Sequence, residues 1–102
     1  MFLVQILLPL YDNDGGPLPR RLFLSVGREL TERFGGLTAY TSAPAKGLWK
    51  SDADRTHRDE IVLYEVMTET LDTDWWRDYR RGLEQRFQQE QVIVRAQETR
   101  LL

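Results

Sequence analysis

Four residues with ionisable or hydrogen-bonding side chains interrupt otherwise apolar segments of the chain: Gln5, Tyr40, Glu65 and Arg95. Leu63 and Met67 flank Glu65, so its carboxylate is partly removed from water, which disfavours the charged form, whereas a nearby guanidinium favours it. Pairs of titratable groups set in a cleft often serve proton transfer or ligand binding. We therefore take these four residues as the first candidate site. The alternative is that they only stabilise the sheet or a subunit interface.

The segment from residue 43 to residue 60 is the second candidate site. It is rich in charged residues with Pro, Gly and Ser, and it has no sustained hydrophobic period, so we predict a long insertion loop. Trp49 predicts that this loop docks on the domain. His57 is the only histidine and the only side chain whose unperturbed pKa lies near neutral pH, which makes it a candidate acid or base. The alternative is an ordinary solvated loop histidine.

Trp75 is a further candidate for ligand contact. It is adjacent to Trp76 in a predicted helix, and neighbouring helical residues cannot both face the centre of the core. Trp76 continues the apolar face, whereas Trp75 lies nearer Gly82, which leaves space for a ligand or for a side chain of a partner. The alternative is an aromatic residue at the margin of the core or at a subunit contact.

Composition and motif patterns exclude several chemistries. The absence of cysteine excludes disulfides, thiolate nucleophiles and cysteine-ligated zinc. Residues 12–15 resemble the opening of a calcium loop but lack its closing glutamate, and one histidine near the carboxylates of residues 52–60 makes a weak metal site. There is no glycine-rich phosphate loop and no serine elbow. We therefore predict neither a metal nor a cofactor.

Hydrophobic periodicity predicts the elements that position these residues. Strand patterns occupy residues 2–9, 37–42, 61–69 and 92–97, and helical patterns run from Pro17 to Gly35 and onward from Asp72. The order strand, helix, strand, strand, helix, strand is typical of the ferredoxin-like α+β plait. We predict an antiparallel four-stranded sheet of order 4-1-3-2 with both helices on one face. At this length we expect one domain over residues 1–102.

Alternation of side chains divides the predicted strands into two faces. One face is almost wholly apolar and should seat the helices: Val4, Ile6, Leu8, Leu37, Ala39, Val62, Tyr64, Val66, Val92 and Val94. The other face carries the four polar residues, which the strand order aligns as a row of Arg95, Gln5, Glu65 and Tyr40. No helix covers this second face, so we expect a homodimer in which a second copy covers it.

Charge and the first residues of the chain bear on its partners and location. A net charge of -2 provides no field that would gather nucleic acid or an anionic membrane. The open face of the third strand lacks the aromatic residues on which RNA-binding members of this fold stack bases. The apolar start lacks a basic region and a cleavage site, and it is too short to cross a bilayer. We predict a cytoplasmic protein with no nucleic-acid or membrane partner.

Three segments, RFGGLTAY at 33–40, GLW at 47–49 and IVLYEVM at 61–67, resemble small uncharacterised bacterial proteins of ferredoxin-like fold. The architecture of the whole chain is similar to the dimeric α+β-barrel superfamily, in which two open sheets face each other. That superfamily includes cofactor-independent monooxygenases, isomerases and ligand-sensing modules. The resemblance implies a dimer and a pocket, but fold alone assigns no reaction.

We therefore expect a small-molecule-binding homodimer with a pocket between the sheet, the second helix and the 43–60 segment. The sequence leaves open whether it is an enzyme. A cofactor-independent enzyme, monooxygenase-like or isomerase-like, would use His57 or Glu65 as acid or base, with Arg95 and Tyr40 orienting an anionic or carbonyl substrate. The remaining ligand contacts would be Gln5, Trp49 and Trp75. The alternative function is a structural or regulatory protein-interaction module with no ligand.

Overall fold

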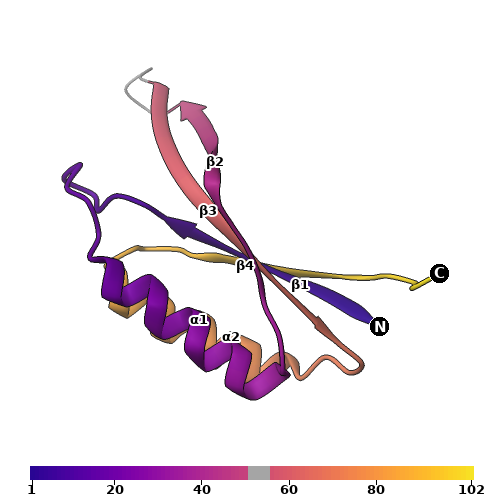
Figure 1. Ribbon diagram of the computed structural model, residues 1–102. Helices are drawn as coiled ribbons and strands as arrows, with labels where there is room; N and C mark the ends of the chain where they lie inside the picture. Colours follow the sequence, from indigo (N-terminus) through magenta and orange to yellow (C-terminus); the bar gives the residue numbers. More distant parts are fainter. Residues whose placement is uncertain (51–55) are drawn as a thin grey trace.

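Four strands and two helices follow one another in the predicted order. The computed structural model describes the backbone of residues 1–50 and 56–102 and the side chains of residues 1–41 and 60–102. The elements are β1 (Phe2–Pro9), α1 (Arg20–Phe34), β2 (Thr38–Lys50), β3 (Thr56–Thr68), α2 (Thr73–Arg86) and β4 (Ile93–Glu98). The antiparallel sheet has the order β2-β3-β1-β4, and both helices lie on one of its faces (Figure 1). This confirms the predicted ferredoxin-like plait, because 4-1-3-2 is the same order read from the opposite edge.

The helix termini have the chemistry that the sequence predicts. Pro19 precedes the first residue of α1, where a missing N–H costs nothing, and Gly35 ends the helix in the left-handed conformation with φ of 80°. Asp72 caps α2 because its Oδ1 accepts a hydrogen bond from the Trp75 backbone N–H at 3.1 Å. In the part of the chain that is described, no helix is long and apolar enough to cross a bilayer.

The hydrophobic core lies between the helices and the face of the sheet that they cover. The strands contribute Val4, Ile6, Leu8, Val62, Tyr64, Val66 and Val92, and the helices contribute Val26, Leu30, Trp76 and Leu83. Phe87, just after α2, is fully buried and packs edge to face on Phe23 at 5.3 Å between ring centroids. The buried Tyr64 hydroxyl donates to the Phe23 carbonyl at 3.2 Å, so its polar group is satisfied. The predicted apolar phase is thus confirmed for β1 and β3 and for Val92, whereas Leu37 and Val94 are only partly buried and Ala39 is exposed.

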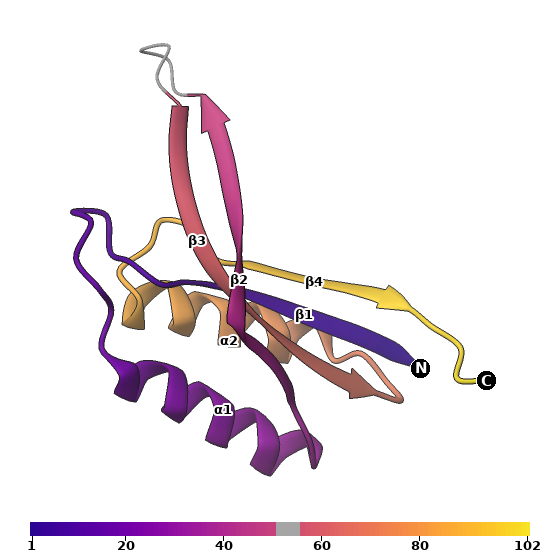
Figure 2. The same cartoon turned by 45° about the horizontal axis from the view of Figure 1, so that its top comes forward.

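Residues 43–50 and 56–60 of the segment predicted as an irregular loop belong instead to two strand arms that extend the sheet, which we call the hairpin. β2 continues to Lys50 and β3 begins at Thr56, with backbone partners running from Ala45–Ile61 to Lys50–Thr56. β3 pairs with β1 only from Ile61 onward, so the two arms extend beyond the other strands (Figure 2). The sequence of these arms has no sustained hydrophobic period, which is why it predicted a loop instead of strands.

A register shift within β2 separates the sheet proper from the hairpin. Tyr40 lies opposite Leu63 and Ala45 lies opposite Ile61, so four residues of β2 face a single residue of β3. Pro44 falls within this stretch and has no backbone N–H to give to a regular ladder. Irregular pairing of this kind bends a strand and increases its twist, and β2 bends here as it leaves the sheet (Figure 1).

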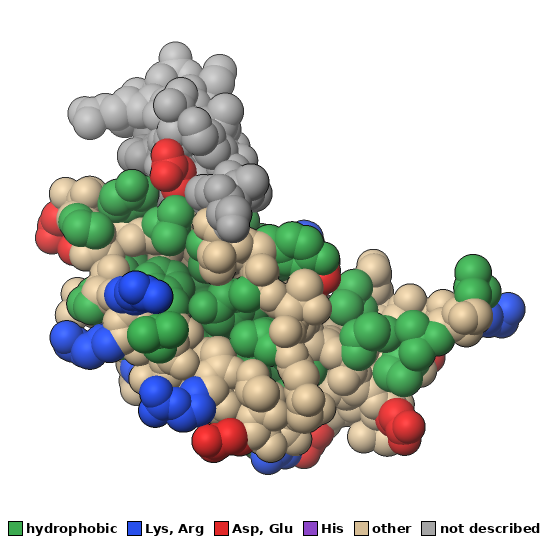
Figure 3. Space-filling model, viewed as in Figure 1, with side chains coloured by type: hydrophobic (Ala, Val, Ile, Leu, Met, Phe, Trp, Pro, Cys, Tyr) green, Lys and Arg blue, Asp and Glu red, His purple; other side chains and the backbone are tan. Residues whose placement is uncertain are grey.

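The core is not fully covered on the side where β2 leaves the sheet. Hydrophobic side chains gather there at the surface, between α1 and the strands above it (Figure 3). A pocket of about 370 Å³ lies on this side of the molecule, and its lining is Leu10, Leu18, Arg20, Phe23, Leu24, Thr41, Val62 and Tyr64.

An ion pair joins the two helices at their exposed side. Glu29 of α1 accepts two hydrogen bonds from Arg86 of α2, at 2.9 and 3.0 Å, and one from the Tyr79 hydroxyl at 2.7 Å. Partial burial of Glu29 favours its neutral form, but the hydrogen bonds from Arg86 and Tyr79 and the charge of Arg86 outweigh it and lower the pKa of Glu29. Burial, together with Glu29, raises the pKa of Tyr79.

Glu29→Gln should therefore change how stability depends on pH. Since folding lowers the pKa of Glu29, its stabilising contribution is present above the pKa of the unfolded chain and is lost as pH falls through the lowered value. We expect the variant to have a smaller free energy of unfolding at neutral pH, with a difference from wild type that shrinks in acid. Urea denaturation across this range measures it. Glu32→Gln, on the exposed side of the same helix, is the control, and an equal loss in both variants would contradict the assignment.

Candidate functional site

A chain of hydrogen-bonded polar side chains crosses the open face of the sheet. Nε of Arg95 on β4 donates to Oε1 of Gln5 on β1 at 2.8 Å. Nε2 of Gln5 in turn donates to Oε2 of Glu65 on β3 at 2.7 Å. The backbone register aligns the three, because Gln5 lies opposite Arg95 on one side and opposite Glu65 on the other. The structure thus brings three of the four residues of the predicted row together.

The amide of Gln5 has one orientation that satisfies both of its neighbours. A guanidinium can only donate hydrogen bonds and an ionised carboxylate can only accept them. Gln5 must therefore present its oxygen to Arg95 and its nitrogen to Glu65. The amide therefore lies between a cation on β4 and an anion on β3 and bonds to both. The two charges are linked but do not neutralise each other directly.

The fourth position of the row differs from the prediction. The residue of β2 opposite Glu65 is Thr38, whereas Tyr40 lies two residues further on, opposite Leu63. A hydrogen bond with the Glu65 carboxylate, together with its charge, nevertheless raises the pKa of the Tyr40 hydroxyl. Sequence reasoning missed Thr38, although it shares the side-chain phase of Tyr40. Strand alternation predicts the face of the sheet to which a side chain points. The pairing partner depends in addition on where β2 begins, which alternation does not reveal.

Glu65 also lines a pocket at one end of the open face. This pocket, of about 330 Å³, lies between the sheet and the turn that joins α1 to β2. Its lining is Leu3, Phe34, Gly35, Gly36, Leu37, Thr38, Glu65 and Met67. The volume falls within the range of small-molecule sites, and the lining combines several apolar side chains with a single carboxylate. We call it the Glu65 pocket.

A second pocket, of about 420 Å³, adjoins the Glu65 pocket at the start of α2. The two share Phe34 and Met67 in their linings. Thr68 lines the second pocket, and its buried Oγ1 has no hydrogen-bond partner among the described residues. A buried hydroxyl without a partner costs free energy, so a ligand that bonded to Thr68 would recover it.

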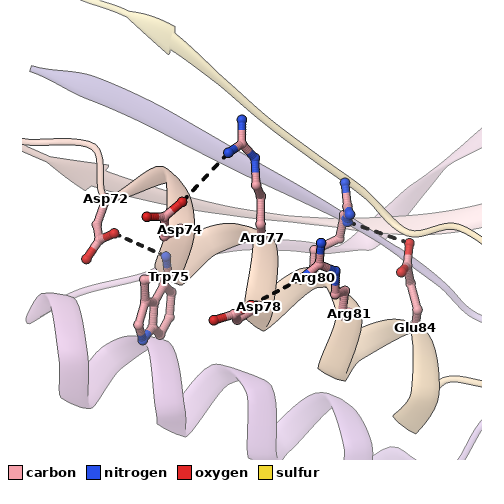
Figure 4. Close-up of polar contacts among 8 residues, drawn as sticks. All are labelled: Asp72, Asp74, Trp75, Arg77, Asp78, Arg80, Arg81 and Glu84. Atoms are coloured by element: carbon pink, nitrogen blue, oxygen red, sulfur yellow. Dashed lines mark hydrogen bonds and ion pairs between the residues drawn. The ribbon is translucent and has the colours of Figure 1, made fainter.

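Trp75 lies in the helical layer rather than in the polar row, and it contributes to the second pocket. Its ring stacks on Tyr79 with centroids 4.8 Å apart, and the Arg33 guanidinium carbon lies 4.1 Å from the Trp75 ring centroid. Figure 4 shows this side chain pointing from α2 toward α1. Trp75 therefore packs the helices together and stays apart from Gln5 and Arg95. Trp75 and Glu65 line two different pockets. The pocket predicted between the sheet, the second helix and the 43–60 segment stays a prediction, because most side chains of that segment are not described.

Two predicted site residues, Trp49 and His57, lie outside the residues whose side chains are described. Their backbones are paired with each other across the hairpin. Their proposed roles in ligand contact and in acid or base chemistry stay predictions.

The acidic turn after β1 has a structural role. Oδ1 of Asp12 accepts hydrogen bonds from the backbone N–H groups of Asp14 at 2.9 Å and of Gly16 at 2.8 Å. An aspartate that bonds to its own turn in this way stabilises the reversal of the chain. Among the side chains that the structure describes, no three acidic or histidine residues are gathered where they could hold a metal ion.

Comparison with known proteins identifies the fold and no family. No family model matches the chain, and no curated protein matches it. The solved structure of a phage SAM lyase in complex with S-methyl-5'-thioadenosine is similar, with a TM-score of 0.66 and 18% sequence identity over 95% of this chain and 80% of that one. The apo state of phage SAM lyase gives a TM-score of 0.62 and 17% identity, over 94% and 78% of the two chains. At these identities the likeness shows a shared ferredoxin-like fold.

Glu65→Gln should lower the pKa of Tyr40. The substitution keeps the size of the side chain but removes the negative charge that holds the Tyr40 proton, so the pKa should fall toward the ordinary value of 10.0. An NMR titration with isotope-labelled tyrosine, assigned with Tyr40→Phe, measures the change. Glu69→Gln removes a charge from the chain just after β3 and is the control. An unchanged Tyr40 pKa in Glu65→Gln, or an equal fall in the control, would show that Glu65 is not the cause.

Proposed function

We propose that the protein binds a small polar molecule in the Glu65 pocket. The observation that carries this proposal is that Glu65 belongs both to the hydrogen-bonded row and to the lining of a pocket of about 330 Å³. Leu3 and Met67 give this pocket apolar walls, so a polar contact with the carboxylate is made in partial exclusion from water, where it is stronger.

The charges of the row determine which ligands suit it. Glu65 attracts a cationic or hydrogen-bond-donating group, while Arg95, on the other side of Gln5, attracts a carboxylate or a carbonyl. Tyr40, whose pKa is raised, keeps its proton at neutral pH and donates to a ligand oxygen. In a catalysed reaction Glu65 would be the acid or base and the other two residues would orient the substrate.

The structural likeness to phage SAM lyase supplies the first ligands to test. SAM, S-adenosylmethionine, carries a sulfonium and an ammonium cation together with a carboxylate, and this polarity matches that of the row. S-methyl-5'-thioadenosine lacks these charged groups, so a comparison of the two separates charge recognition from recognition of the nucleoside. The likeness suggests ligands for the test, and a shared fold by itself assigns no reaction.

The proposal includes a second copy of the chain that covers the open face. This face exposes Tyr40 at 51%, Met67 at 42% and Ile93 at 48%, and these residues lie around the polar row. Large apolar side chains around a polar centre favour association with a matching surface. A partner sheet would close the Glu65 pocket and remove water from Glu65.

A thermal-shift screen of SAM, S-methyl-5'-thioadenosine and a broad metabolite panel tests the binding proposal. A ligand at a hundred times its dissociation constant stabilises by about 2.7 kcal/mol, which raises the melting temperature by roughly ten degrees in a domain of this size. We expect Glu65→Gln and Arg95→Met to weaken a true hit about tenfold, because each loses a charge-assisted hydrogen bond. Arg28→Met, on the exposed side of α1, should keep it. A wild-type protein without hits, or hits that survive in both site variants, would favour the interaction module with no ligand.

Ile93→Glu tests the covered face. Sedimentation velocity should find wild-type dimers and monomers of the variant, because a buried carboxylate without a partner is costly at an interface. Leu24→Glu, at a residue of α1 that is 54% exposed, adds the same charge to the helical side and should remain dimeric. A monomeric wild-type protein, or equal dissociation of both variants, would refute the dimer through the open face.

A further inference from the structure

A further pocket lies at the edge of the sheet, between β4 and α2, and we call it the β4 edge pocket. Its volume is about 320 Å³. Nine residues line it, and three of them are arginines, Arg77, Arg80 and Arg95, while none is acidic. The lining has no residue in common with the Glu65 pocket. The chain as a whole is slightly acidic, so three arginines around one pocket are a local concentration of positive charge.

The arginines come to this pocket from two elements. Arg77 and Arg80 are three residues apart on α2, a spacing that puts both on one side of the helix. Figure 4 shows both side chains pointing from α2 toward β4. Arg95 lines the same pocket from β4, and the hydrogen bond from its Nε to Gln5 fixes its position. Neighbouring Arg81 points elsewhere and pairs with Asp78 at 3.3 Å.

The acidic residues nearest to these arginines form only long ion pairs with two of them. Arg77 lies 3.7 Å from Asp74, and Nε of Arg80 lies 3.8 Å from Glu84, both beyond hydrogen-bond length. The same Glu84 oxygen is used by the Val92 backbone N–H at 2.9 Å. Nε of Arg80 is buried and has no hydrogen-bond partner among the residues that the structure describes. An anion in the pocket would give Arg77 and Arg80 charge-assisted hydrogen bonds that Asp74 and Glu84 do not provide.

Protection of an edge strand is the other use for arginines at this place. Charged side chains on an edge strand prevent it from pairing with the edge of another sheet. That role needs solvated charge on β4, but it needs neither a pocket nor a buried donor on the helix. The pocket and the buried Nε of Arg80 therefore favour an anion site.

We propose that the β4 edge pocket binds the phosphate group of a small phosphorylated molecule. Guanidinium groups form paired hydrogen bonds with phosphate oxygens, and three positive charges match a dianion better than a single carboxylate. Leu71, Trp76 and Val94 line the rest of the pocket and suit an apolar part of the ligand. This site is additional to the Glu65 pocket. It attracts anionic groups, whereas the carboxylate of the Glu65 pocket attracts cationic ones.

Titration of the full chain at low salt with inorganic phosphate, pyrophosphate and phenyl phosphate tests the proposal, with NMR and calorimetry as readouts. We expect saturable binding, with amide shifts centred on Thr73, Arg77, Arg80 and Ala96, and tighter binding of phenyl phosphate than of inorganic phosphate. The double variant R77Q/R80Q should weaken binding by about tenfold or more, because charged hydrogen bonds are lost. Arg81→Gln, which removes one positive charge from the same helix outside the pocket, should stay within about twofold of wild type.

Three results would overturn the proposal. They are no saturable binding by the wild-type protein, an equal loss of binding in Arg81→Gln, and amide shifts centred on the Glu65 pocket. The shift map of the wild-type protein decides the matter even if the double variant does not fold. Glu65→Gln should retain phosphate binding, so a failure here is distinguishable from a failure of the function proposed for the Glu65 pocket.

Discussion

The placement of both helices on one face of the sheet is the constraint on which the other features depend. Sheet residues that point to the helices must be apolar, and Val4, Ile6 and Leu8 are buried as a result. Residues of the opposite phase are released from that requirement. They can carry an amide, a carboxylate and a guanidinium within hydrogen-bonding distance of one another. The pairing of β1 with β3 and with β4 sets these groups opposite one another. The sheet is therefore both the wall of a core and a rigid platform for polar groups.

Opposite charges are bridged by an amide on the open face of the sheet and paired directly in the helical layer. Gln5 separates Glu65 from Arg95 and bonds to both, while Glu29 and Arg86 form a direct pair on the helical side. The direct pair joins two helices, and because its charges neutralise each other it attracts a charged ligand only weakly. The separated pair keeps one charge at each end of a short row. The same chemical groups thus serve packing in one layer and are available for recognition in the other.

Side-chain alternation predicts the face of the sheet to which each strand residue points, because successive residues point to opposite faces whatever their pairing partners are. Pairing partners are harder to predict, because they depend on where a strand starts and on register shifts, and so Thr38 occupies the place expected for Tyr40. The sequence of the hairpin arms has no sustained hydrophobic period, so their backbone pairing could not be predicted from it. The residues that line a pocket are also hard to predict from the sequence. On sequence alone Arg77, Arg80 and Arg81 are alike, and only the packing of α2 against β4 distinguishes them.

Arg95 belongs at once to the hydrogen-bonded row of the open face and to the lining of the β4 edge pocket. A ligand that draws its guanidinium toward one side must strain or release the bond to Gln5 on the other. Thermodynamic linkage makes any such effect reciprocal, so occupancy of either pocket would change the affinity of the other by the same factor. If both proposed sites are occupied, this one side chain at the edge of the sheet would couple the two binding equilibria.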